Sequence, residues 1–204
     1  LILSLSVLLI TAGGYIINDI YDIEAYKINK PHKVYISNTI SKKRATVFYL
    51  VVTILGLILG LWLSFLKNIE ILLLYFIATA VLLFLYSKYL KRLPLLGNLL
   101  ISLLVPLIIM LVYEFDKKLV AKSELFNDLF LSIIVFYYMF FAFLTTLIRE
   151  IIKDIEDVDG DFKLKMKTLP VLIGKIRTRN ISIVLSLLLL FFLFLLIKDS
   201  FDSN

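Results

Sequence analysis

Residues 45–66 read ATVFYLVVTILGLILGLWLSFL, and none of them is Asp, Glu, Lys, Arg or His. A helix crosses the hydrocarbon core of a bilayer with about 20 predominantly apolar residues. This run reaches that length without a charged side chain. It therefore predicts a transmembrane helix.

Five other segments of the chain are similarly apolar. Hydrophobic residues make up 61% of the chain, and its mean hydropathy is +0.97, whereas soluble domains contain about 45–50% apolar residues. We therefore predict an all-α fold, a polytopic transmembrane helical bundle of about six spans. The predicted spans are Leu1–Ile17, Ala45–Leu66, Ile71–Tyr86, Leu95–Tyr113, Leu129–Ile148 and Ile181–Ile197.

The basic residues indicate which side of the membrane each connection faces. Of the 22 Lys and Arg residues, 17 lie in three connections, residues 18–44, 87–94 and 149–180. Alternate connections share one side of the membrane, and cytoplasmic loops carry an excess of Lys and Arg. We therefore predict a multi-pass protein of the cell membrane whose basic connections face the cytoplasm. Because the basic residues lie between apolar spans, we predict no nucleic-acid partner.

Cysteine and histidine usage excludes several kinds of site. The chain has no cysteine and one histidine, His32. It therefore has neither a disulfide framework nor a Cys-ligated zinc or iron–sulfur site. A single histidine also excludes a multi-His metal centre, and a Ser-His-Asp triad would have to use His32.

The first acidic motif opens the first basic connection and reads Asn18-Asp19-Ile20-Tyr21-Asp22. If the first span continues as a helix, Asn18 and Asp22 lie on one face, because residues four apart are neighbours. Two oxygen ligands suit Mg²⁺, which proteins usually hold with one or two carboxylates plus a substrate phosphate. Taken alone, the spacing also fits a solvated polar helix end.

The second acidic motif follows the fifth span, where residues 149–161 read REIIKDIEDVDGD. Asp154, Asp157 and Asp161 would form one stripe of a helix that extends past the membrane. Alternatively, Gly160 ends the helix and places Asp161 on a turn. Ionisable groups at the end of an apolar span are functional candidates, whereas we expect Glu156 and Asp159 to face solvent.

Basic residues accompany both motifs. Carboxylates that hold metal ions beside Lys and Arg side chains would make a site for a diphosphate, because its charge is neutralised from two directions. The excess of basic residues in cytoplasmic loops would also produce these residues without a site. They are Lys27, Lys30, Lys33, Lys88, Lys91, Arg92, Lys163, Lys165 and Lys167.

These motifs resemble those of the UbiA superfamily of intramembrane prenyltransferases over nearly the whole chain. Asn18-Asp19-x-x-Asp22, with Ile28-Asn29-Lys30-Pro31-x-Lys33 and Ser37, looks like its first motif, N-D-x-x-D-x-x-x-D and a basic stretch. Asp154-x-x-Asp157-x-x-x-Asp161, with Lys167-Thr168-Leu169-Pro170 and Gly174, is similar to its second. Tyr86-Ser87-x-x-Leu90-Lys91-Arg92-x-Pro94-x-x-Gly97-Asn98 is similar to its middle connection.

The sequence departs from the family pattern in two ways. Tyr26 stands where the first motif often has its last Asp, and Lys33 and Val34 replace Arg and Pro. The site would therefore rely on Asn18, Asp19 and Asp22. The family usually has nine spans, and these six resemble the second to the seventh. Residues 1–204 would then form one prenyltransferase-like domain without one N-terminal and two C-terminal helices.

The resemblance implies transfer of an isoprenyl group from a prenyl diphosphate to a lipophilic acceptor, with Mg²⁺ as cofactor. Asn18, Asp19 and Asp22 would hold one ion, Asp157 and Asp161 would hold a second, and Asp154 would hold a ligand or a bound water in place. The catalytic candidates are Asp22, Asp157 and Asp161. The candidates to contact the diphosphate are Lys33, Lys91, Arg149, Lys153 and Lys167.

Two questions stay open at this point. An ion-coupled transporter would also use acidic residues, but it predicts them near the centres of the spans, and the six spans as bounded here contain none. The acceptor is either geranylgeranylglyceryl phosphate, which the second motif favours, or an aromatic or quinone precursor.

Overall fold

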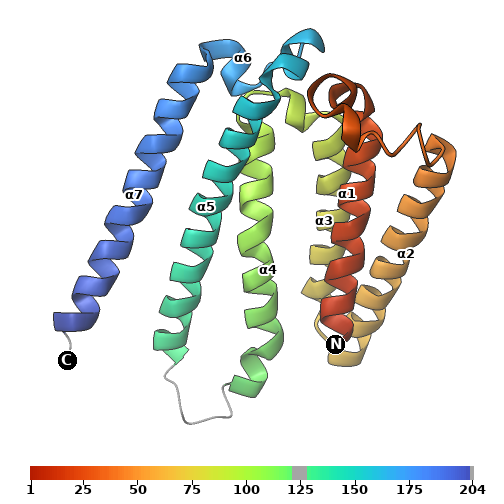
Figure 1. Ribbon diagram of the computed structural model, residues 1–204. Coiled ribbons are helices and arrows are strands. Elements are labelled where there is room, and N and C mark those ends of the chain that lie inside the picture. Colours follow the sequence, from red (N-terminus) through yellow and green to blue (C-terminus); the bar gives the residue numbers. More distant parts are fainter. Residues whose placement is uncertain (121–127, 203–204) are drawn as a thin grey trace. The chain divides into compact units, whose positions relative to one another are not determined.

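The computed structural model describes residues 1–120 and 128–202 (Figure 1). The described part is helical apart from its turns, with one isolated bridge between Ile36 and Ile40. The elements are α1 (Ile2–Asn29), η1 (Pro31–Lys33), α2 (Lys42–Lys67), α3 (Glu70–Lys88), η2 (Leu90–Arg92), α4 (Leu96–Val120), α5 (Asp128–Lys163), α6 (Leu169–Ile173) and α7 (Lys175–Asp202).

Six of these helices, α1 to α5 and α7, are long and apolar enough to cross a membrane. They correspond one to one to the predicted spans, so the chain is a multi-pass membrane protein with the predicted all-α fold. Two of them continue beyond the apolar run. α1 extends past Ile17 to Asn29, and α5 extends past Ile148 to Lys163. Both acidic motifs are therefore helical, and α5 continues through Gly160.

The described residues form two compact units. Unit 1 contains Leu1–Leu93 together with Asp159–Met166, and unit 2 contains Pro94–Val158 together with Lys167–Asn204. The helix α5 contributes to both, because its last residues belong to unit 1.

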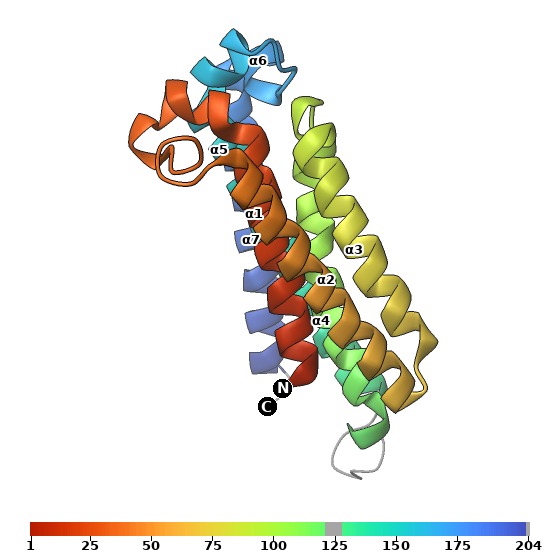
Figure 2. The same cartoon turned by 90° about the vertical axis from the view of Figure 1, so that its right-hand side faces the viewer.

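In unit 1, α1 packs against α2 and α3 (Figures 1 and 2). Glycine allows side chains of the neighbouring helix to pack close to the backbone, and small residues are common where membrane helices pack together. A Cβ atom on Gly13 would lie 2.2 Å from Thr53 Oγ1, and one on Gly60 would lie 2.4 Å from Phe76 Cδ2. The Ser6 hydroxyl also donates to the Gly56 carbonyl at 2.7 Å.

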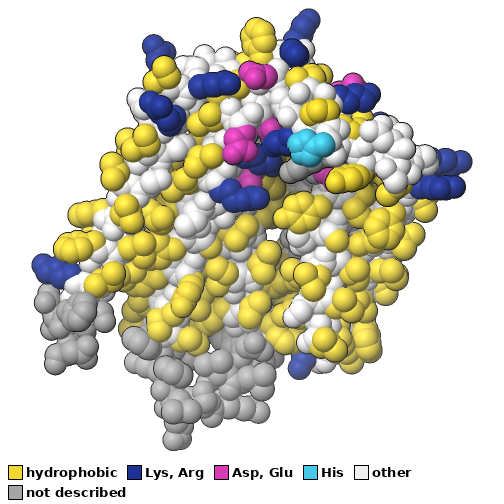
Figure 3. All heavy atoms as spheres, viewed as in Figure 1, with side chains coloured by type: hydrophobic (Ala, Val, Ile, Leu, Met, Phe, Trp, Pro, Cys, Tyr) yellow, Lys and Arg dark blue, Asp and Glu magenta, His cyan; other side chains and the backbone are white. Residues whose placement is uncertain are grey.

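Local signals set the limits of α2. The Ser41 hydroxyl accepts from the Arg44 backbone N–H at 3.3 Å, which caps the first turn. At the other end, Asn68 adopts a left-handed conformation with φ 52°, a common helix terminator. The flank of α2 is apolar in Figure 3, with basic side chains at its end. Ile58 and Phe65 are 54% and 73% exposed, as expected for side chains that face lipid.

The end of unit 1 that carries the first motif has its own apolar cluster. Ile17, Ile20 and Ala45 are buried, and Tyr21 and Phe84 pack against them. The Tyr21 and Phe84 rings meet edge to face, with centroids 6.4 Å apart. This cluster fixes the helical turn that contains Asn18 and Asp22 against α2 and α3.

Unit 2 has a corresponding cluster beside the second motif. Leu147 and Ile151 of α5 are buried together with Leu169 of α6. The Phe140 and Phe192 rings join α5 to α7 with centroids 5.0 Å apart. Because Leu147 and Ile151 occupy the buried face of α5, Glu150 and Asp154 are brought toward that face as well.

Candidate active site

The first acidic motif forms a small network with the connection after α3. Asn18 Nδ2 donates to Asp22 Oδ2 at 2.7 Å, which confirms that the two side chains share one face of α1. Lys91 Nζ donates to Asp22 Oδ1 at 2.5 Å and to Asn18 Oδ1 at 3.2 Å. The Lys91 and Asp22 side chains are only 9% and 16% exposed. A buried positive charge is thus held between two oxygens.

The turn η2 directs Lys91 to this place. α3 ends at Lys88, and the turn η2 follows it, with backbone hydrogen bonds from Arg92 N–H to the Tyr89 carbonyl and from Leu93 N–H to the Leu90 carbonyl. Lys88, three residues earlier, instead places its ammonium group over the Tyr89 ring, 4.8 Å from the centroid. The turn therefore assigns different partners to two neighbouring lysines.

The donor chemistry of this network fits a hard cation. Asn18 Oδ1 and Asp22 Oδ1 converge on the ammonium group of Lys91, which stands in for a cation. Among the described residues, no three His, Cys, Asp or Glu side chains gather in a metal-binding arrangement. A divalent ion held by Asn18 and Asp22 would therefore complete its shell with water or substrate oxygens, as Mg²⁺ commonly does.

The other members of the first motif have different surroundings. Asp19 Oδ1 accepts from the Tyr26 hydroxyl at 2.9 Å, so Tyr26, which replaces the acidic residue of the family motif, binds a motif carboxylate. Glu24 and Lys27 form an exposed ion pair at 2.7 Å. The side chain of Lys33 lies outside the described part of the structure.

In unit 2, Asp154 is held by a residue of α4. Asn98 Nδ2 donates to Asp154 Oδ2 at 2.9 Å, and Asn98 is 7% exposed. The Ser102 hydroxyl donates to the Asn98 carbonyl at 2.6 Å in the next turn of α4. The sequence placed Asn98 in the middle motif, but nothing in the sequence indicated that Asn98 would bind Asp154.

Two of the predicted phosphate-binding cations share one buried carboxylate. Glu150, 4% exposed, accepts from Arg149 Nη1 at 2.7 Å and from Lys153 Nζ at 3.4 Å. The cationic side chains remain 70% and 42% exposed. Sequence reasoning missed Glu150, although its place on the face of Leu147 and Ile151 was a usable signal.

The remaining acidic residues of the second motif are buried or exposed as the predicted helical stripe requires. Asp161 is 7% exposed and Asp157 is half-buried, whereas Glu156 and Asp159 are exposed, which confirms that they face solvent. Asp157 belongs to unit 2 and Asp161 to unit 1, one helical turn apart on α5. Lys167 is exposed in the turn before α6.

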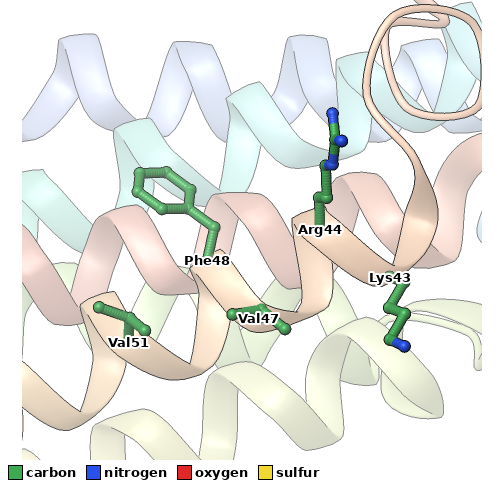
Figure 4. Close-up of a pocket in the computed structure, with 5 residues that line it drawn as sticks. All are labelled: Lys43, Arg44, Val47, Phe48 and Val51. Atoms are coloured by element: carbon green, nitrogen blue, oxygen red, sulfur yellow. The ribbon is translucent and has the colours of Figure 1, made fainter.

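A hollow of about 340 Å³ lies elsewhere, on the surface of α2 (Figure 4). Its lining residues are exposed and include no residue of either acidic motif. It is therefore a feature of the lipid-facing surface and not a candidate active site. The lining residues are Lys43, Arg44, Val47, Phe48 and Val51.

Residues 1–201 match the UbiA prenyltransferase family. The chain belongs to this family. The match covers both acidic motifs and the middle connection, so the resemblance inferred from those motifs is confirmed.

Two proteins that are similar to this chain are both digeranylgeranylglyceryl phosphate synthases. The digeranylgeranylglyceryl phosphate synthase of Saccharolobus solfataricus is 40% identical over 93% of this chain and 62% of its own length. That of Methanosphaera stadtmanae is 35% identical over 91% of this chain and 61% of its own length. This chain thus spans about three fifths of the length of these relatives.

A solved structure is similar as well. It comes from a study of the biosynthesis of digeranylgeranylglyceryl phosphate synthase in membranes. Its chain is 31% identical, with a TM-score of 0.59 over 92% of this chain and 61% of that chain. The likeness supports the UbiA assignment at the level of the fold.

Proposed function

We propose that this protein transfers an isoprenyl group from a prenyl diphosphate to geranylgeranylglyceryl phosphate within the membrane, with Mg²⁺ as cofactor. The relatives named above, all digeranylgeranylglyceryl phosphate synthases, support this acceptor over an aromatic or quinone precursor. The proposal assigns residues 1–204 to one prenyltransferase-like domain with its acidic motifs on the cytoplasmic side.

The observation that carries the proposal is the convergence of Asn18 and Asp22 on one buried positive charge. An ion-coupled transporter would need acidic residues near the middle of its spans. Here Asp22 lies on the part of α1 beyond its apolar run, where a water-soluble headgroup can reach it. A Mg²⁺ ion held by Asn18 and Asp22 would take its other oxygen ligands from water or from a diphosphate.

In the reaction, the allylic C–O bond of the prenyl diphosphate breaks and its electron pair stays with the diphosphate. Asn18 and Asp22 would hold one Mg²⁺ ion, and Asp157 and Asp161 would hold a second; these ions would supply positive charge that stabilises the leaving group. An acceptor hydroxyl forms the new C–O bond and gives its proton to solvent.

The basic side chains bind and orient the leaving group. Lys91 would contact a phosphate oxygen once its ammonium group no longer binds Asp22. Arg149 and Lys153 present exposed charges that Glu150 holds in place, so they lose less conformational entropy when they bind phosphate. Lys33 and Lys167 are further candidates for this contact.

Membranes that contain the full-length protein test the proposal. They are supplied with labelled geranylgeranyl diphosphate and either geranylgeranylglyceryl phosphate or an aromatic acid acceptor, with Mg²⁺ or with EDTA. We expect Mg²⁺-dependent label in an ether lipid. Label in the aromatic product would overturn the acceptor, and the absence of transfer to any acceptor would overturn the enzyme assignment.

A further inference from the structure

The end of α1 contacts the second acidic motif within unit 1. Asn29 is the last residue of α1, and its Oδ1 accepts a hydrogen bond from the Gly160 backbone N–H at 2.8 Å. The contact joins residues that are 131 positions apart in the chain. Gly160 lies between Asp159 and the buried Asp161.

A side chain at position 160 would displace the Asn29 carboxamide from its present place. A Cβ atom there would lie 2.4 Å from Asn29 Nδ2 and 2.8 Å from Asn29 Cγ, closer than side-chain atoms pack. The glycine does not end α5, because the helix continues to Lys163. Glycine inside a helix is about 1 kcal/mol less favourable than alanine. The close approach of Asn29 therefore explains a residue that helix propensity disfavours.

Asn29 also belongs to the face of α1 that carries the first motif. Asp22 follows Asn18 by four residues and Asn29 follows Asp22 by seven, which are roughly one and two turns of a helix. They therefore form one stripe. The oxygens of Asn18 and Asp22 gather on a cation, and farther along the same stripe Asn29 holds the backbone beside Asp161.

We propose that Asn29 is a positioning residue that sets the place of Asp161 by holding the backbone at Gly160, and that this contact is the reason for glycine at 160. The inference rests on the proposed function, in which Asp161 holds a metal ion. The Asn29 carboxamide touches neither the metal ion nor the substrate. It acts through the carboxylate that follows Gly160.

A double-mutant cycle in the full-length protein tests the coupling. The variants are Asn29→Ala, Gly160→Ala and the double variant, with Asp159→Ala as an exposed neighbouring control. Two measurements are made on each, the Mn²⁺ affinity by electron paramagnetic resonance without substrate and the Mg²⁺ concentration for half-maximal transfer. Thermal unfolding is followed separately, to report on the fold.

Each single variant at 29 and 160 should weaken metal affinity by about 3- to 10-fold, the range expected when one hydrogen bond that orients a ligand is lost. The Asp159→Ala control should stay within about twofold of the wild type. In the double variant the added methyl group no longer meets a carboxamide. Its metal affinity should therefore match that of Asn29→Ala alone.

Several results would overturn the inference. If the losses at 29 and 160 multiply in the double variant, the two residues act independently. If unfolding temperatures fall while both metal measurements keep wild-type values, the contact is structural only. If Asn29→Ala does not accumulate, Asn29→Ser, which is too short to reach Gly160, takes its place in the same cycle. Lack of transfer by the wild type would instead count against the proposed function, and the Mn²⁺ titration distinguishes the two failures.

Discussion

Replacing Lys91 with methionine should tighten metal binding while it slows transfer. Lys91 Nζ occupies the two oxygens, Asn18 Oδ1 and Asp22 Oδ1, that would bind a metal ion. A metal ion must therefore displace the ammonium group before it can bind there. Methionine keeps an unbranched side chain of similar length and removes both the charge and the hydrogen-bond donor.

The size of the effect follows from the contact that is lost. A hydrogen bond to a charged group contributes about 1.5–3 kcal/mol, and the Lys91 and Asp22 side chains are both mostly buried. Since about 1.4 kcal/mol corresponds to a tenfold change in an equilibrium constant, Mn²⁺ affinity without substrate should rise roughly 10- to 100-fold in Lys91→Met. Transfer should fall by about 10²–10³-fold, because the leaving diphosphate loses a stabilising charge.

The assay is a Mn²⁺ titration of the detergent-solubilised full-length protein by electron paramagnetic resonance, paired with steady-state transfer. Lys88→Met is the matched control, because Lys88 lies over the Tyr89 ring; its Mn²⁺ affinity should stay close to wild type. Without metal, Lys91→Met should also unfold at a lower temperature, since the Asp22 carboxylate loses its positively charged partner and keeps only the hydrogen bond from Asn18, and Mg²⁺ should restore much of the difference. Unchanged or weaker Mn²⁺ binding in a folded Lys91→Met would refute the reasoning.

Three further predictions concern the second motif, the packing of unit 1 and the topology. Asp157→Ala should lower transfer about 10²–10³-fold while the exposed Asp159→Ala stays within a few-fold in the same labelled-substrate assay; equal losses would contradict the helical stripe. Thr53→Val should leave the unfolding temperature unchanged or raise it. The described residues offer the buried Thr53 Oγ1 no hydrogen-bond partner, and an unsatisfied buried hydroxyl costs about 1–3 kcal/mol. A clear decrease in the unfolding temperature would show that this hydroxyl has a hydrogen-bond partner. Single cysteines at Asn38 and Lys67 in this cysteine-free chain should react with an impermeant maleimide from opposite sides of the membrane, with Asn38 on the cytoplasmic side. Labelling of both from the same side would contradict the prediction that α2 crosses the membrane, and labelling of Asn38 from the outer side would show that the topology is reversed.

The sequence was sufficient for the six long helices and for the helical face that Asn18 and Asp22 share. Apolar runs of about 20 residues have few structural uses other than a membrane span, so all six long helices could be predicted. The four-residue spacing of Asn18 and Asp22 likewise predicted a shared face, because helix geometry alone sets it. The contact between Tyr26 and Asp19, two turns apart, follows the same period and was within reach of the same argument.

The long-range contacts could not be predicted in this way. Lys88, Lys91 and Arg92 are close in sequence, and only the turn η2 decides which of them reaches Asp22. In the sequence, Glu150 cannot be distinguished from the other charged residues near it, because its burial depends on the packing of α5 in unit 2. Gly160 had an ordinary local interpretation as a helix end, and its contact with Asn29 depends on how two distant helix ends meet.

The two stretches of unit 1 leave the ribosome at different times. Synthesis proceeds from the N-terminus, so residues 1–93 emerge with Asn18, Asp22 and Lys91 before α4 and α5 exist. The close contacts of Gly13 and Gly60 can form in this interval, and Lys91 can neutralise Asp22 while later helices are inserted. Residues 159–166 arrive last. Docking of Gly160 on Asn29 therefore has to wait for the synthesis of α4 and most of α5, and a nascent chain arrested before it would already contain Asn18, Asp22 and Lys91.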